Sequence, residues 1–386
     1  MEKLADAEYG SAGTVQFLKK GAKMNRICFF CGDITRNGGT ERVSTMIANA
    51  LAMQGTYTIL FLSLTEQAQK LFFPLHKKIR HYALGEKWIN PGPGYLKIIP
   101  RLRRFLKQQE IDIMIDIDIV LDVLSIPAAK GLKTKIISWE HFNYNYEIQC
   151  LYRRCILKYS VKRTDYIVTL TNGDKQSYEK YLKRTGNISA IYNPMQKPEG
   201  KQAGQKEPWL VTVGRLIPRK GIDYLAKVAV QVLKKYPGWK WLVIGDGEEF
   251  GFLQNIASQN HLENQLILTG RIENVNDYLK RARIFVMTSR AEGLPMCLLE
   301  AKAFSIPIVS FDIQTGPNEM VEHGRNGYLI PPFDCQDMAE KLMLLMGDES
   351  LQEQFAAHAQ DNLAKFQMDY ILIQWNQVLQ LLLPRG

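Results

Sequence analysis

The stretch Arg26-Ile-Cys-Phe-Phe-Cys31 is followed, after a glycine-containing loop, by Val43-Ser-Thr-Met-Ile-Ala-Asn-Ala-Leu51. After its first residue the first run is continuously apolar, which is typical of a parallel strand buried on both faces. In the second run the apolar residues follow the i, i+3, i+4, i+7, i+8 spacing of one buried helix face: Val43, Met46, Ile47, Ala50 and Leu51. Gly55 then acts as a stop signal. Together the two runs predict a βα unit.

The same alternation of strand-like and helical stretches continues along the chain and predicts doubly wound α/β sheets. In the first half the further expected strands are Tyr57–Leu64, Ile111–Asp116, Lys135–Ser138, Tyr166–Leu170 and Ile188–Tyr192. In the second half they are Trp209–Val213, Lys240–Ile244, Leu266–Leu268, Ile284–Met287, Pro307–Phe311 and Tyr328–Ile330.

The length of 386 residues favours two domains of ordinary size. A polar segment rich in Pro and Gly, 194–208, is expected to link them. We therefore expect an extension over 1–23, a first domain over 24–193, a second domain over 209–368 and a final amphipathic helix over 369–386. Two such domains enclose a cleft, in which ligands lie at the carboxyl ends of the strands.

The composition is that of a globular protein, with 46% hydrophobic and 23% charged residues. A net charge of +10 favours anionic partners, without choosing among nucleic acid, phosphorylated substrates and acidic lipids. The six cysteines are scattered, as expected in a reducing cytosolic compartment. Cys28 and Cys31 form a C-x-x-C, but strand geometry places their side chains on opposite faces, which does not suit a shared metal. Neither a secretory signal nor a membrane span is evident.

Several loops that follow expected strands carry glycine or basic residues. Gly38 and Gly39 open the first helix, where a backbone can approach an anion closely. The G-x-G-x-x-G spacing of a dinucleotide site is absent, so a plain tight turn is the alternative. Gly245 and Gly247, in Gly245-Asp-Gly247, likewise allow tight passage beside a ligand but taken alone predict only a turn.

A basic loop follows the first strand of the second half, in Val213-Gly-Arg-Leu-Ile-Pro-Arg-Lys-Gly-Ile-Asp223. Arg215, Arg219 and Lys220 repel one another there unless an anion joins them. A diphosphate would satisfy these cations through charge-assisted hydrogen bonds. A solvated basic turn is the alternative.

Two acids bracket an apolar run in Ala291-Glu-Gly-Leu-Pro-Met-Cys-Leu-Leu-Glu-Ala301. Pro295 suits the first turn of a helix, so we expect Glu292 in a loop and Glu300 inside a helix that begins near Pro295 or Met296. The apolar neighbours of Glu300 favour burial, and a buried carboxylate needs a partner. The hydroxyl pair of a ribose would serve, while the amides at the helix start face a phosphate.

These motifs together resemble the retaining glycosyltransferases of family four (group 1), which have the GT-B fold. The resemblance covers nearly the whole chain from about Met24, and it rests on the order and spacing of Gly38-Gly39-Thr-Glu-Arg42, Gly214-Arg215, Lys220-Gly221, Gly245-Asp-Gly247, Glu292 with Glu300, Gly316-Pro-Asn-Glu319 and Asn326-Gly327. Variants such as Trp139-Glu-His-Phe-Asn143 are most similar to the branch that builds bacterial surface polysaccharides and lipid-linked oligosaccharides. The resemblance implies two Rossmann-like βαβ domains facing across a cleft, with a C-terminal helix that packs back on the first domain.

The resemblance also implies roles for individual residues. Arg215 and Lys220 would bind the diphosphate of the donor, Glu300 its ribose and Glu292 the hydroxyls of its sugar. His141 would lie by the transferred sugar and the acceptor. Further donor contacts are implied for Gly38, Gly39, Gly214, Gly245, Gly247, Gly293, Leu294, Pro295 and Met296.

The implied activity is transfer of a hexose or N-acetylhexosamine from a nucleotide-diphosphate sugar, UDP-sugar above all, to a glycan or polyprenyl-diphosphate-linked acceptor. We expect no metal and no other cofactor, because fixed cations would do the work of a metal. A D-x-D that could hold a metal is present among Asp112, Asp116 and Asp118, but we interpret these acids as structural. The alternatives are an epimerase or phosphorylase of the same fold, or a non-catalytic nucleotide- or nucleic-acid-binding protein.

A basic helix in the first half raises the question of a membrane partner. Cations and apolar residues alternate over Lys97–Lys107, which suits either an anionic membrane surface or an ordinary helix packed on the sheet. With the implied lipid-linked acceptor, the first reading predicts a cytoplasmic protein at the inner face of the plasma membrane, with no nucleic-acid partner.

Overall fold

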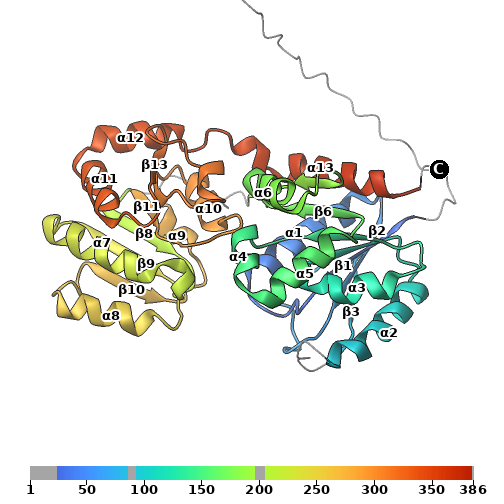
Figure 1. The fold of residues 1–386 in the computed structure, drawn as a ribbon. Coiled ribbons are helices and arrows are strands. Elements are labelled where there is room, and N and C mark those ends of the chain that lie inside the picture. Colours follow the sequence, from blue (N-terminus) through green and yellow to red (C-terminus); the bar gives the residue numbers. More distant parts are fainter. Residues whose placement is uncertain (1–23, 86–92, 196–204, 385–386) are drawn as a thin grey trace, which may run out of the picture.

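The computed structural model describes residues 24–85, 93–195 and 205–384. The expected extension over 1–23 and most of the expected linker lie outside these residues. Two parallel sheets, each wound by helices, account for the described chain (Figure 1).

The first sheet has seven parallel strands in the order β3-β2-β1-β4-β5-β6-β7. Its strands are β1 (Arg26–Cys31), β2 (Thr58–Ser63), β3 (Arg80–Ala83), β4 (Ile113–Ile117), β5 (Lys135–Trp139), β6 (Tyr166–Thr169) and β7 (Ile188–Ala190). The helices of this part are α1 (Gly39–Gln54), α2 (Pro93–Gln108), η1 (Ile119–Leu121), α3 (Asp122–Ala129), α4 (Tyr144–Gln149), α5 (Leu151–Val161) and α6 (Asn172–Leu182).

The second sheet has six parallel strands in the order β10-β9-β8-β11-β12-β13. Its strands are β8 (Trp209–Val213), β9 (Lys240–Ile244), β10 (Leu266–Gly270), β11 (Ile284–Met287), β12 (Ile308–Phe311) and β13 (Gly327–Ile330). The helices that follow them are η2 (Pro218–Lys220), α7 (Ile222–Lys235), α8 (Phe250–Gln259), α9 (Asn276–Leu279), α10 (Met296–Ala303), η3 (Pro317–Glu319), α11 (Cys335–Gly347), α12 (Glu349–His358), η4 (Leu363–Phe366) and α13 (Met368–Leu382).

The apolar pattern of β1 explains why it is central to the first sheet. Phe29 pairs in register with Phe61 on one side and with Ile115 on the other, and all three side chains are buried. Cys28 and Cys31 pack into different hydrophobic clusters, so they point to opposite faces of the sheet as predicted. Helix α1 ends where expected, with Gly55 in the left-handed conformation at φ 72°.

Sequence reasoning missed the edge strand β3, because Arg80-His-Tyr-Ala83 is polar and half exposed. Several strands also begin or end a few residues away from the predicted positions. The strand expected over Ile111–Asp116 runs over Ile113–Ile117, and the last strand of the first sheet stops at Ala190.

Helix α13 returns to the first domain after the second sheet is complete, as the fold prediction requires (Figure 1). The ring of Trp375 lies 4.9 Å from that of Trp139 on β5, in an edge-on arrangement. Asn376 donates a hydrogen bond of 3.0 Å to the Gln54 side chain at the end of α1. The last helix of the described chain thus packs on the first domain.

Helix α2 packs its apolar side on the first sheet and exposes its basic side. Ile98, Leu102 and Leu106 are buried in the cluster between α2 and the first sheet, so the apolar side packs on the sheet. The basic residues Lys97, Arg101, Arg104 and Lys107 are exposed. Among the described residues no helix combines the length and apolar character that crossing a membrane requires.

Candidate active site

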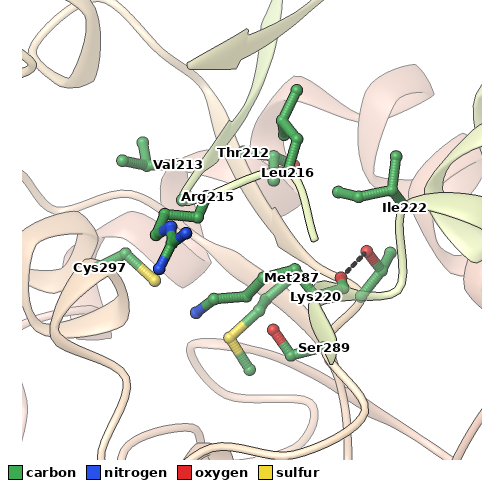
Figure 2. Close-up of a pocket in the computed structure, with 11 residues that line it drawn as sticks. Thr212, Val213, Arg215, Leu216, Lys220, Ile222, Met287, Ser289 and Cys297 are labelled. Carbon is green, nitrogen blue, oxygen red and sulfur yellow. Dashed lines mark hydrogen bonds between the residues drawn. The ribbon is translucent and has the colours of Figure 1, made fainter. Parts of the chain in front are cut away.

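A pocket lies at the carboxyl end of β8, between the loop that follows this strand and the start of α10 (Figure 2). Its lining residues come from β8 and its loop, from the end of β11 and from α10: Thr212, Val213, Gly214, Arg215, Leu216, Lys220, Ile222, Met287, Thr288, Ser289 and Cys297. Figure 2 shows the side chains of Arg215, Lys220 and Cys297 directed toward a common space. This is the edge of a parallel sheet at which ligands are expected.

Lys220 and Glu292 form an ion pair at this pocket, although the two residues are far apart in the sequence. The Lys220 Nζ lies 2.5 Å from Oε1 of Glu292. Ser289 donates a second hydrogen bond of 2.6 Å to the same oxygen. Lys220 is held from its main chain as well, since the Thr288 hydroxyl donates to its carbonyl oxygen at 3.1 Å.

The pKa values of the pair are shifted toward the charged forms. Burial would raise the pKa of Glu292, but Lys220 and Arg219 outweigh it and lower this pKa. Burial would likewise lower the pKa of Lys220, but Glu292 outweighs it and raises this pKa. Both groups therefore stay charged near neutral pH, and a fixed cation faces the pocket.

The loop that carries Glu292 is held by residues of both domains. Asn143 donates a hydrogen bond of 2.7 Å to the Glu292 carbonyl oxygen, and Thr315 donates another of 2.8 Å to the same atom. Gly293 lies so close to the main chain of His141 that an added Cβ would be 2.4 Å from the His141 carbonyl oxygen. Only glycine fits this approach, which brings His141 and the acidic loop together.

His141 is the candidate residue contributed by the first domain. Its side chain is buried, and burial lowers its pKa to about 3. The imidazole is therefore neutral at physiological pH. Its ring lies 4.5 Å from that of Trp139, and its Nε2 makes no hydrogen bond to the described residues. A neutral imidazole offers one hydrogen-bond donor and one acceptor, so the Nε2 of His141 can form a hydrogen bond with a substrate hydroxyl.

Helix α10 begins as predicted, with Pro295 as the preceding cap residue and Met296 as the first helical residue. Leu294 is buried under this turn. Glu300 lies inside the helix, and its Oε1 accepts a hydrogen bond of 2.7 Å from Arg42 of α1. The expected partner for Glu300 was a ribose; in the described chain a cation of the first domain occupies this position.

The predicted glycines divide into two groups. Gly214 lines the pocket, whereas Gly245 and Gly247 pack against it: added Cβ atoms would lie 1.9 Å from the Gly214 carbonyl oxygen and 2.3 Å from that of Leu216. Gly38 and Gly39 open α1, and the Glu41 carboxylate lies beside Gly38. That carboxylate is buried, which raises its pKa.

The D-x-D acids have structural partners. Asp112 accepts a hydrogen bond of 2.8 Å from the Arg26 main chain, and Asp116 accepts one from the Ser125 hydroxyl. Asp118 caps η1 and pairs with Arg153 at 3.1 Å. Over residues 24–85, 93–195 and 205–384, no three His, Cys, Asp or Glu side chains gather in a group that could hold a metal ion.

Sequence reasoning missed four residues that complete the site: Arg42, Asn143, Ser289 and Thr315. Arg42 and Asn143 stand in stretches that carried the resemblance, but neither could be paired with its partner from spacing alone. Arg219, expected in the pocket, instead lies over the rings of Phe142 and Tyr146 in the first domain, with its Cζ 5.7 Å from each centroid.

Two family models match consecutive parts of the chain. Residues 37–196 match Glycosyltransferase Family 4, and residues 196–362 match Glycosyl transferases group 1. The junction at residue 196 falls within the expected linker.

Three known proteins illustrate the similarity. An uncharacterized glycosyltransferase of Haemophilus influenzae is 34% identical over 92% of this chain and 100% of its own length. The alpha-1,4-N-acetyl-D-galactosaminyltransferase of Campylobacter jejuni, whose name includes a diNAcBac-PP-undecaprenol acceptor, is 25% identical over 92% of this chain and 98% of its own. A crystal structure of an S. aureus TarM mutant with fondaparinux, alpha-GlcNAc-glycerol and UDP has a TM-score of 0.64 and 25% identity, covering 73% of this chain and 58% of that one.

Proposed function

The chain belongs to the group 1 glycosyltransferases, and from this premise we propose that it is a retaining, metal-independent enzyme. It moves a hexose or N-acetylhexosamine from a UDP-sugar to a glycan or lipid-linked acceptor in surface polysaccharide biosynthesis. The observation that carries this proposal is the pocket at the end of β8, where Arg215 and Lys220 converge beside Glu292.

The donor fits this pocket by charge and by spacing. Arg215 is exposed, and Figure 2 shows its guanidinium directed into the same space as the Lys220 amine, so a diphosphate there accepts charge-assisted hydrogen bonds from both. Glu300 lies about one turn into α10, which begins at Met296 after the Glu292 loop, and it holds the ribose. UDP as the nucleotide is supported by the TarM complex, which contains it.

The chemistry follows from where charge develops. Departure of the nucleoside diphosphate builds negative charge on its terminal phosphate, and Arg215 and Lys220 stabilise that charge. Glu292 fixes the direction of the Lys220 amine and contacts the hydroxyls of the sugar. Because Lys220 is held in place by Glu292 and Arg215 lies beside it, these cations supply the stabilisation that a metal supplies in other transferases. We propose retention of configuration from the resemblance to retaining glycosyltransferases, with the acceptor hydroxyl attacking from the leaving-group face of the sugar.

The acceptor side belongs to the first domain. His141 is neutral and lies against Gly293, so it contacts the transferred sugar or the acceptor hydroxyl. A lipid-linked acceptor is supported by the name of the Campylobacter jejuni relative. The exposed cations of α2, Lys97, Arg101, Arg104 and Lys107, then hold a cytoplasmic enzyme at the inner face of the plasma membrane. Binding to anionic vesicles that survives charge reversal at these four positions would argue against this surface.

The proposal is tested by thermal unfolding with ligands. UDP should raise the unfolding temperature by linkage, whereas a single-stranded oligonucleotide at equal charge concentration should not. A panel of UDP-sugars without acceptor should then show slow hydrolysis of one of them. Stabilisation by the oligonucleotide alone would favour the nucleic-acid-binding alternative, and interconversion of sugars without release of UDP would favour an epimerase.

A further inference from the structure

An ion pair joins the two domains at the proposed ribose position. Arg42 lies in the first turn of α1, and its Nη1 approaches Oε1 of Glu300 on α10 to 2.7 Å. The two side chains are 28% and 19% exposed, so water reaches both partners. The pair therefore spans the domain boundary without being sealed inside it.

The surroundings keep these two residues facing each other. Asn143 of the first domain bonds to the Glu292 carbonyl oxygen, and the His141 main chain lies against Gly293. Both contacts lie just before α10 begins, one to two turns from Glu300. The two domains thus touch at the walls of the proposed donor site.

We propose that Arg42 is an interdomain latch that competes with the nucleotide ribose for Glu300. This inference rests on the proposed function, which assigns the ribose to that carboxylate. A ribose diol donates two hydrogen bonds and uses both carboxylate oxygens. Arg42 holds one of these oxygens and approaches it from the facing domain, so the ribose displaces the guanidinium when it binds.

The Lys220–Glu292 pair is fixed more firmly than the Arg42–Glu300 pair. This difference indicates that a ligand can break the contact between Arg42 and Glu300. Glu292 is 7% exposed, receives a further bond from Ser289 and is fixed through its main chain. Glu300 is more exposed, and its partner reaches it on a long side chain from another domain. A pair that water reaches on both sides contributes only modestly to stability, because water can replace the lost contact. Arg42 can therefore leave Glu300 at small cost when a ligand enters.

The experiment is a calorimetric titration of UDP into the whole chain and its Arg42→Gln variant. We expect UDP to bind the variant about two- to fivefold more tightly, since the ribose no longer displaces a cation. Arg36→Gln is the matched control, because Arg36 precedes the same helix and its side chain lies 3.8 Å from Glu41 and away from Glu300. The Arg36→Gln variant should bind UDP as tightly as the parent does. Unchanged or weaker binding by Arg42→Gln overturns the latch.

Glu300→Gln separates the latch from the function on which it rests. If this variant binds UDP as the parent does, the ribose assignment fails and the latch fails with it. If it binds UDP more weakly while Arg42→Gln gives no gain, the latch alone is wrong. In the Glu300→Gln background, Arg42→Gln should have no further effect; a gain of the same size there would show that Arg42 acts elsewhere.

Discussion

At the scale of single residues, the site depends on Lys220, whose amine is fixed in position and remains charged. Lys220 contributes a cation whose position is set by Glu292 and whose pKa is raised by it. A surface lysine spreads over many rotamers, whereas this one is directed by a buried carboxylate. The same pairing keeps Glu292 ionised inside the fold, so each residue depends on the other.

Lys220→Ala should therefore reduce both activity and stability. Loss of a charge-assisted contact to the leaving phosphate is expected to lower kcat about 100-fold or more. The Glu292 carboxylate left behind is buried without its cation, which should cost about 1–3 kcal/mol of unfolding free energy. Transfer rates and urea unfolding would measure the two effects.

Lys227→Ala, on the solvent side of α7, is the control for this substitution. It should change neither transfer nor stability appreciably. A Lys220→Ala enzyme with full kcat would show that the leaving phosphate is stabilised elsewhere.

Residue patterns located the acids but not their partners. The spacing of Glu292, Pro295 and Glu300 predicted a loop acid and a helix acid, and the structure places them so. The pairs Lys220 with Glu292 and Arg42 with Glu300 join distant parts of the chain, and sequence spacing carries no information about such contacts. They arise only when the sheets and then the domains are assembled.

At the scale of elements, the first sheet contains a second polar cluster beneath α3. Asp116 on β4 and Asp122 at the start of α3 are both fully buried, and Asp116 accepts a hydrogen bond from Ser125. Burial raises the pKa of Asp122 to about 6, and burial together with Asp122 raises the pKa of Asp116. Two such carboxyls favour sharing a proton over ionising together.

This cluster predicts a pH-dependent stability. Because the folded pKa of Asp122 lies above its usual value of 3.8, the fold binds a proton more tightly than the unfolded chain. The contribution is present below pH 3.8 and is lost as the pH rises toward about 6. Asp122→Asn should remove much of this dependence, so that unfolding free energies at pH 4.5 and pH 7 lie closer together than in the parent.

Urea unfolding at the two pH values checks this expectation. Glu353→Gln, at an exposed position on α12, is the control and should leave the dependence as it is. An Asp122→Asn variant with the parent's pH dependence would place the titrating group elsewhere.

The elements themselves were largely predictable, because buried parallel strands carry continuous apolar runs. Phe29 and its neighbours show this most clearly. The edge strand β3 was missed for the converse reason: it is paired on one side only, and its polar residues face solvent. Strand ends shifted because the hydrogen bonds between neighbouring strands at their ends, such as that from the Asp112 amide to the Arg26 carbonyl oxygen, cannot be read from hydrophobicity.

At the scale of the whole molecule, the site is made of two domains that touch. Glu319 of η3 shows how the second domain is fixed to the first. Its carboxylate accepts hydrogen bonds from the Gly173 amide at 3.1 Å and from the Tyr192 hydroxyl at 2.5 Å. The sequence predicted two sheets and a returning helix, but the relative placement of the domains depends on such contacts and could not be inferred from either half alone.

The central claim is that a nucleoside diphosphate sugar binds between the β8 loop and α10. A crystal structure of the chain with UDP tests it most directly. We expect the diphosphate against Arg215 and Lys220 and the ribose against Glu300, with the Arg42 side chain turned away from Glu300. UDP bound elsewhere, with the Lys220 and Glu300 side chains unengaged, would contradict it.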